Sequence, residues 1–128
     1  MNKNRKTEET PLRTDGMDLI RAACRALLEK KGENIVALDV RSLSSMADFH
    51  ILVSGTSAPH IKAMRNDLLL VLKKLGVACY RKAGDPESGW LILDYGDVVV
   101  HLFIPSIRAY YALEDMWPKT AVDWGDIP

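Results

Sequence analysis

The stretch from Trp90 to Ile104 constrains the fold more than any other part of this sequence. It contains two runs rich in aliphatic and β-branched residues, 90–93 and 98–104, separated by Asp94-Tyr95-Gly96-Asp97. Two such runs around a short glycine-containing turn predict a hairpin of antiparallel strands. Because successive strand residues point to opposite faces of a sheet, this hairpin has to present two different surfaces.

One surface of the predicted hairpin is aliphatic and the other is mixed in composition. The aliphatic face consists of Leu91, Leu93, Val98, Val100 and Leu102. We expect helices to cover it and to form the main core. If Tyr95 and Gly96 are the loop residues, the facing pairs of the mixed face are Trp90 with His101, Ile92 with Val99, and Asp94 with Asp97. A glycine bulge at the turn would instead shift the pairing by one residue.

The mixed face is the candidate docking surface of this chain. A tryptophan flanked by polar groups is the composition of a binding hot spot. The alternative is that a helix covers this side as well, which would make Trp90 and His101 ordinary buried residues.

Helix and strand patterns alternate along the rest of the chain. Apolar residues at three- and four-residue spacing predict helices after Met17 and after Pro59, ending at Gly32 and Gly76. Thr56 or Ser57 would cap the second helix. The remaining predicted elements are strands at 35–40, 49–53 and 77–82, a turn at 83–88, and a last helix from about Ser106 to Trp117 after Pro105.

The predicted order α-β-β-α-β-β-β-α indicates a mixed α/β domain, in which helices pack on a mixed sheet of about five strands. We expect a flexible N-terminal segment at 1–15, one domain at 16–117 and a loose tail at 118–128. A chain of 128 residues with 48% apolar content has room for one globular domain. Its apolar runs are far shorter than the ~20 residues of a membrane span.

Charge is balanced over the whole chain, with 17 basic and 17 acidic residues, but not along it. Residues 83–128 hold two basic and eight acidic side chains, a net charge of −6. Overall balance argues against a general nucleic-acid binder. The acidic last third either keeps the protein soluble or steers it toward a basic partner protein.

Nothing in the sequence matches a known catalytic motif. There is no Walker loop, dinucleotide fingerprint or nucleophile elbow, and the three histidines are too scattered for a metal cage. Gly55-Thr56-Ser57 resembles the phosphate-binding entry of nucleotidyltransferases, but their paired carboxylates are missing. We therefore expect no enzyme activity, no metal and no cofactor. Lacking a secretory signal and a Cys-x-x-Cys pair, the chain is expected in the cytoplasm.

Three segments together resemble one family. They are Ala47-Asp48-Phe49 leading into Ser54–Ser57, then GWLILDYGDVVVHLF at 89–103, then RAYYALEDMW at 108–117. In this order, over about residues 17–117, they resemble the Iojap family of ribosomal silencing factors (RsfS). The sequence departs from the family pattern at Ala83-Gly84, where Glu-Gly is usual, and at His50, where an apolar residue is usual.

The resemblance implies a nucleotidyltransferase-like fold without that chemistry. It also implies docking on large-subunit ribosomal protein fourteen at the face where the small subunit would join. The bound factor would thereby block subunit joining and repress translation when nutrients are scarce. Homodimers of the isolated protein are implied as well.

The predicted partner-binding residues are Trp90, Ile92, Asp94, Asp97, Val99, His101, Tyr111 and Glu114. Burial of the apolar members would supply most of the affinity, and the carboxylates would meet basic groups of the partner. In the last helix, spacing predicts that Tyr110, Leu113 and Trp117 lie in the core. Arg108 is expected to pair with an acidic neighbour inside the fold.

Two other functions stay open. A nucleotidyltransferase-like enzyme would bind a nucleotide and a divalent metal near Gly55–Ser57. An RNA-binding ribosome assembly factor would use the basic residues of the first two-thirds, namely Arg65, Lys73, Lys74, Arg81 and Lys82. We expect no membrane contact and no sequence-specific recognition of nucleic acid.

Overall fold

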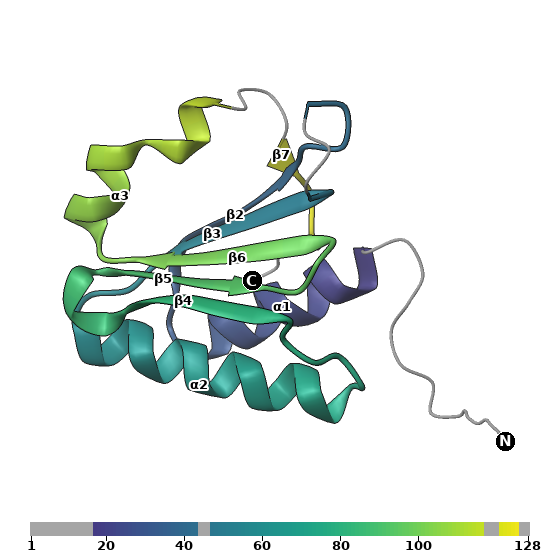
Figure 1. Cartoon of the computed structure of the whole chain (residues 1–128), viewed down its shortest axis with the longest axis horizontal. Coiled ribbons are helices and arrows are strands. Elements are labelled where there is room, and N and C mark those ends of the chain that lie inside the picture. The colour runs from purple at the N-terminus through teal and green to yellow at the C-terminus, as the bar shows by residue number, and fades with distance from the viewer. Residues whose placement is uncertain (1–16, 44–46, 117–120, 126–128) are drawn as a thin grey trace, which may run out of the picture.

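A computed structural model of the chain describes residues 17–43, 47–116 and 121–125. The elements are α1 (Met17–Glu29), β2 (Glu33–Asp39), β3 (Phe49–Ser54), α2 (Ala58–Lys74), β4 (Arg81–Asp85), η1 (Pro86–Ser88), β5 (Trp90–Asp94), β6 (Val98–Phe103), α3 (Pro105–Tyr111), η2 (Leu113–Met116) and β7 (Ala121–Val122). The strands form one sheet in the order β4-β5-β6-β3-β2-β7 (Figure 1). In the described part of the chain, β3 and β6 pair in parallel and the other neighbours are antiparallel. The predicted mixed α/β fold is confirmed.

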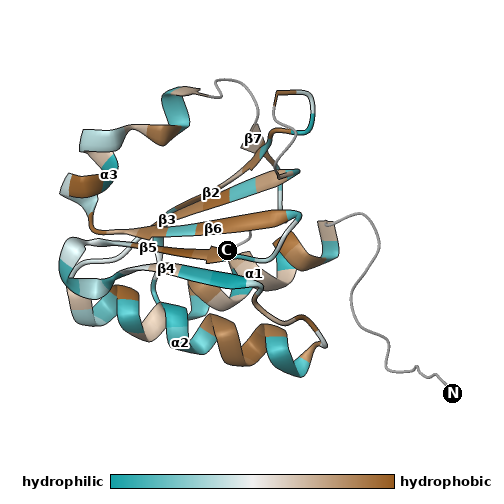
Figure 2. Ribbon diagram, in the orientation of Figure 1, coloured by the Kyte–Doolittle hydropathy of each residue, from teal (hydrophilic) through white to brown (hydrophobic). Residues whose placement is uncertain are grey.

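Helices α1 and α2 lie side by side on one face of the sheet (Figure 1). Their buried side chains include Ile20, Cys24 and Leu27 of α1 and Ile61, Met64, Leu68 and Leu72 of α2. Under them the predicted aliphatic face of the hairpin is fully buried, so this prediction is confirmed. Figure 2 shows the contrast between the largely hydrophobic β6 in the sheet and the hydrophilic edge strand β4.

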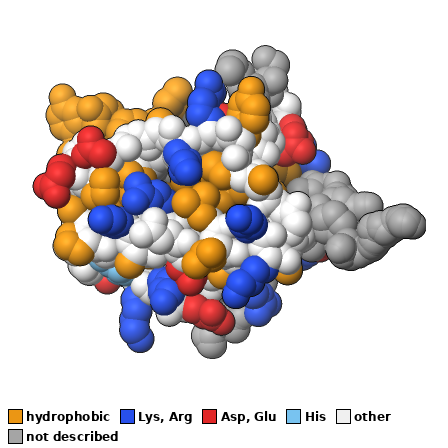
Figure 3. All heavy atoms as spheres, turned by 60° about the horizontal axis from the view of Figure 1, so that its bottom comes forward, with side chains coloured by type: hydrophobic (Ala, Val, Ile, Leu, Met, Phe, Trp, Pro, Cys, Tyr) orange, Lys and Arg blue, Asp and Glu red, His pale blue; other side chains and the backbone are white. Residues whose placement is uncertain are grey.

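The start of α2 follows the predicted signals. Ser57 caps the helix, accepting a hydrogen bond from the backbone N–H of His60 (3.2 Å), and Pro59 occupies the first turn. The outer surface of α2 is mixed: seen from that side, Lys and Arg side chains surround an apolar area (Figure 3). Within the described ranges, none of the helices is long and apolar enough to cross a membrane.

The hairpin turn lies one residue later than predicted. The backbone N–H of Tyr95 donates to the carbonyl of Val98 (2.9 Å), so Gly96 and Asp97 are the loop residues. Gly96 has φ +90°, which suits the first central position of a type II′ turn. The Asp94 carboxylate accepts the Gly96 N–H (2.8 Å) and holds the turn in this form.

This turn changes the facing pairs of the mixed face. The observed pairs are Trp90 with Phe103, Ile92 with His101, and Asp94 with Val99. The predicted register was therefore wrong, and so was the alternative of a glycine bulge that shifts the pairing by one residue. Because the shift amounts to two residues, every side chain keeps its predicted face.

The third predicted strand is displaced. Residues 81–85 form β4, whereas 77–82 had been expected, and the residues expected to turn at 83–85 pair with β5. All five residues of this edge strand are exposed, so no alternation of apolar residues reveals it. The short helix η1 provides the turn instead, and Gly89 follows it with φ +80°.

The C-terminal part differs from the prediction in two ways. Helix α3 ends at Tyr111 because Ala112 adopts a left-handed conformation (φ +46°), and Ser106 does not cap it. Beyond residue 120, Ala121 and Val122 pair with β2, and Trp124 is only 7% exposed in the main core. Within the expected loose tail, residues 121 and 122 are thus part of the sheet and Trp124 is part of the core. The predicted flexible segment 1–15, the boundary near 117 and Trp117 lie outside the described residues.

Replacement of Trp124 by alanine tests this packing. The Trp124→Ala variant should lose about 3 kcal/mol of unfolding free energy, because it empties a large site in the core. Urea denaturation measures the loss, with Tyr80→Ala as control: Tyr80 is 76% exposed and its removal should change stability by about 0.5 kcal/mol or less. Equal stability of the two variants would contradict the packed position of Trp124.

Candidate partner-binding site

The mixed face extends beyond the hairpin onto β3. The parallel register sets His50 beside Val99, Leu52 beside His101 and Ser54 beside Phe103. These side chains therefore share the side of the sheet that faces away from α1 and α2. The mixed face consequently comprises Trp90, Ile92 and Asp94 of β5, Val99, His101 and Phe103 of β6, and His50, Leu52 and Ser54 of β3.

Helix α3 and η2 cover one end of the mixed face. Ile107 and Leu113 pack there on a second, smaller core that contains Leu52 and Phe103. The predicted core position of Leu113 is confirmed. The alternative prediction, that a helix covers the mixed face, is therefore correct for one end of it. At the other end Ile92 and Val99 stay partly exposed.

Trp90 lies at the border between the covered and uncovered parts. It is partly buried, and its ring centroid lies 5.0 Å from that of Phe103 and 4.7 Å from that of Tyr111. Tyr111 in turn meets Tyr110 edge-on at 4.9 Å. Tyr110 is 79% exposed, so its predicted core position was wrong, because the helix stops one residue after it and no further turn packs against it.

A chain of hydrogen bonds joins Trp90 to two histidines. The indole Nε1 donates to Nδ1 of His101 (3.2 Å), and Nε2 of His101 lies 2.9 Å from Nδ1 of His50. An indole N–H is a donor only, so Nδ1 of His101 has to be unprotonated and its proton sits on Nε2. His101 is then neutral and donates to His50.

Burial keeps both imidazoles neutral. Desolvation, together with the nearby His50, lowers the pKa of His101 to about 3. Desolvation also lowers the pKa of His50, although the neighbouring Asp94 carboxylate opposes this shift. The sequence identified His101 but missed His50, since its departure from the family pattern gave no sign of the contact with His101.

Arg108 fastens α3 and η2 to the sheet. Its Nε and Nη2 donate to the two carboxylate oxygens of Glu114 (3.0 and 2.8 Å), which lowers the pKa of Glu114. Its Nη1 donates to Oγ of Ser54 (2.9 Å) and to the carbonyl of Asn34 (2.8 Å). The expected internal role of Arg108 is confirmed, and both oxygens of Glu114 are engaged within the fold.

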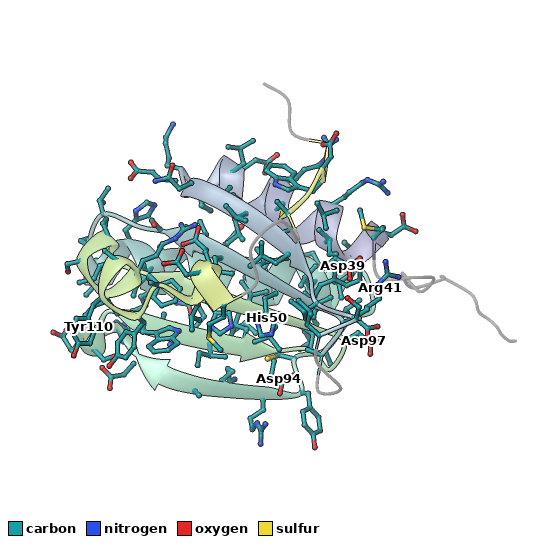
Figure 4. All side chains as sticks on the ribbon, turned by 90° about the horizontal axis from the view of Figure 1, so that it is seen from above. Asp39, Arg41, His50, Asp94, Asp97 and Tyr110 are labelled. Atoms are coloured by element: carbon teal, nitrogen blue, oxygen red, sulfur yellow. The ribbon has the colours of Figure 1, made fainter. Side chains whose placement is uncertain are left out.

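The remaining predicted carboxylates lie at the far end of the sheet from Tyr110, as Figure 4 shows for Asp94 and Asp97. The carboxylate of Asp94 accepts the Gly96 N–H in the hairpin turn, and its Oδ2 lies 3.3 Å from Nη2 of Arg81. Asp97 is exposed in the turn. The structure thus brings the aromatic and histidine residues of the site together and sets Asp97 apart from Tyr111.

The loop before α2 uses its polar groups internally. The backbone N–H of Thr56 donates to Nδ1 of His60 (2.9 Å), and Nε2 of His60 lies 2.8 Å from the carbonyl of Lys30. Among the described residues, no group of three or more His, Cys, Asp or Glu side chains is placed to hold a metal ion.

Comparison with known proteins identifies the family. The family model of the ribosomal silencing factor during starvation, RsfS, matches residues 13–128. This chain belongs to the RsfS family. The ribosomal silencing factor RsfS of Halalkalibacterium halodurans is 37% identical over 100 residues, which cover 78% of this chain and 86% of that protein.

Two further relatives extend this likeness. The mouse protein named mitochondrial assembly of ribosomal large subunit protein 1 is 31% identical over 100 residues, 76% of this chain and 44% of the mouse protein. A crystal structure of a Chromobacterium violaceum protein is 34% identical with a TM-score of 0.78, covering 85% of this chain and 94% of that chain. The RsfS fold is therefore retained here.

Replacement of Arg108 tests its role in holding α3. Arg108→Lys keeps the positive charge but cannot form the forked pair with Glu114, so we expect a loss of roughly 2 kcal/mol in urea denaturation. Arg21→Lys, in the exposed pair with Asp18, is the matched control and should change stability by about 0.5 kcal/mol or less. A similar effect of both substitutions would contradict the role given to Arg108.

Because His101 is buried in its neutral form, we expect the protein to lose stability in acid. Above about pH 6.5 neither the folded nor the unfolded chain protonates His101, so stability is constant. Below about pH 6.5 His101 is protonated in the unfolded state alone. The free energy of unfolding therefore falls by about 2 kcal/mol between about pH 6.5 and pH 5. His101→Gln keeps an acceptor for Trp90 and a donor for His50 but does not titrate. Urea denaturation at both pH values should show a smaller loss in this variant; an undiminished loss would rule out His101 as its source.

Proposed function

We propose that this protein is a ribosomal silencing factor that binds the large ribosomal subunit and blocks joining of the small subunit by occupying space there. The contact is with large-subunit ribosomal protein fourteen, and the outcome is repression of translation when nutrients are scarce. Membership of the RsfS family supports the general role. The name of the mouse relative supports the large subunit as the partner.

The observation that carries this proposal is an aromatic cluster at the border of the uncovered mixed face. Tyr110 and Tyr111 are exposed, and Tyr111 contacts the ring of Trp90. The partly exposed side chains of Ile92 and Val99 continue the same side of the sheet. Large aromatic residues with aliphatic neighbours contribute most of the binding energy in protein interfaces. This composition supports a protein partner.

Charge supports a basic partner. The exposed carboxylate of Asp97 makes no ion pair among the described residues, whereas Asp94 is paired with Arg81 and Glu114 with Arg108. Asp97 is therefore the predicted acidic residue best able to meet a cation of the partner. Such a peripheral charge acts mainly on the rate and the register of association.

The proposed mechanism is steric, without a bond made or broken. The internal hydrogen bonds of Thr56 and His60 support this, since they occupy the loop that a nucleotidyltransferase would use for phosphate. A nucleotidyltransferase-like enzyme would instead release heat on binding a nucleoside triphosphate with Mg²⁺. We expect no heat in calorimetry with this protein.

Two further parts of the proposal come from the family resemblance. Isolated copies of the chain form homodimers, and silencing takes place in the cytoplasm, where the ribosomes are. Sedimentation equilibrium at several protein concentrations tests the dimer.

Removal of the aromatic side chains should weaken binding to large ribosomal subunits. Trp90→Ala should weaken it about 30-fold, corresponding to a hot-spot loss of about 2 kcal/mol. Tyr110→Ala should weaken it about fivefold, and because Tyr110 is 79% exposed this variant should keep the wild-type stability. Cosedimentation with purified large subunits in a sucrose gradient measures both effects.

The matched control is Leu28→Ala, which removes a partly exposed apolar side chain from α1, on the other side of the sheet. Small subunits are then added to the same gradients. Wild type and Leu28→Ala should reduce the joined peak, and the two aromatic variants should not. Wild-type binding by both aromatic variants would remove this site from consideration.

A further inference from the structure

We propose that a second surface of the protein, formed by α2 and the inner side of β4, binds the phosphate backbone of ribosomal RNA. We call it the basic face and define it by Lys62, Lys73 and Lys74 of α2 and Lys82 of β4. The inference rests on the proposed function, because the large subunit is the partner that offers both protein and RNA.

The basic face is assembled from two separate elements. Lys73 and Lys82 line the same shallow hollow, together with Leu69, Val77, Ala78 and Cys79. A second hollow along the helix is lined by Lys62 with Ala58, Pro59, Asp85, Pro86 and Glu87. Each of the two hollows between α2 and the β4 edge is therefore lined by at least one cation, and the second also by two carboxylates. Figure 3 shows this side, where Lys and Arg side chains surround an apolar area.

The four ammonium groups of the basic face are unpaired within the described part of the chain. Among the described residues none of them makes an ion pair or a hydrogen bond, whereas Arg81 and Arg108 on the other side of the sheet are each paired with a carboxylate. Helix α2 holds four basic residues and a single acidic one, Asp67. Unpaired charges of one sign along one surface produce a field that attracts an anionic ligand.

Helix stabilisation does not account for these lysines. Lys73 and Lys74 lie in the last turn of α2, where cations are favoured by the helix dipole. Lys62 lies near the opposite end of the helix, where the dipole gives no such benefit, and Lys82 belongs to a strand. A common ligand explains all four positions.

An exposed aromatic ring at the β4 edge of the sheet favours RNA over an acidic protein. Tyr80, just before β4, is 76% exposed, and the Arg81 guanidinium lies 5.8 Å from its ring centroid. An exposed aromatic ring beside a cation can stack on unpaired bases while the cation binds phosphate. Because β4 belongs to the edge that the basic face and the mixed face share, one docked molecule can contact RNA and protein together.

The test compares two variants of the full chain with equal loss of charge. Lys73→Gln/Lys82→Gln removes two cations from the basic face, and Arg21→Gln/Arg25→Gln removes two from the exposed surface of α1. Binding to large ribosomal subunits is measured between about 50 and 200 mM KCl. Each lost phosphate contact should reduce the slope of log K against log salt by about 0.7 to 0.9, so we expect a reduction of 1.4 to 1.8, roughly, for the basic-face variant and none for the control.

Three further probes separate the partners. Deproteinised large-subunit RNA should bind wild type in a salt-dependent manner and the basic-face variant about tenfold more weakly. Isolated ribosomal protein fourteen should bind both equally. Polyglutamate tests an acidic protein ligand and should bind neither.

The outcomes distinguish this inference from the proposed function. RNA binding by the basic face is overturned if the basic-face variant has the same salt slope as wild type with large subunits. It is also overturned if this variant loses binding to polyglutamate alone. Neither result contradicts the proposed silencing function. If wild type fails to bind large subunits while the free RNA still distinguishes the two variants, the silencing proposal fails and the RNA contact is supported.

Discussion

The parallel pairing of β3 with β6 at the centre of the sheet determines the layout of the whole molecule. It joins a strand from the first half of the chain to one from the second, and α2 is part of the connection between them. One side of the pair takes the helices α1 and α2. The register also sets His50 beside Val99 and Ser54 beside Phe103 on the other side. The histidine chain and the anchoring point of Arg108 both follow from this single alignment.

The contacts of Arg108 determine how much of the mixed face α3 and η2 cover. A forked ion pair with Glu114 and bonds to Ser54 and Asn34 hold α3 and η2 at one end of the sheet. Phe103 is sealed there, while Ile92 and Val99 are not. These four hydrogen bonds offset most of the cost of burying the guanidinium. The same contacts leave Tyr110 and Tyr111 at the border of the open region.

Sequence reasoning succeeded where a strong periodicity exists and failed where local geometry decides. Alternation assigned each residue of the hairpin to its face, and helical spacing located α1 and α2. The register was missed because type II′ geometry puts Gly96 first in the loop. Strand β4 has no buried residue and β7 pairs only two, so neither has an apolar pattern. Within the site, the internal role of Arg108 followed from residue type. The positions of Tyr110 and His50 instead depend on the left-handed Ala112 and on the parallel register.

The position of β7 has a consequence for how the chain is made. Strand β2 is synthesised long before residues 121 and 122, which in the described part of the chain are the residues that pair with its outer edge. Until then the nascent protein carries an open strand edge, the feature that most readily recruits a strand from another chain. Synthesis of residues 121 and 122 is thus also the step that closes this edge.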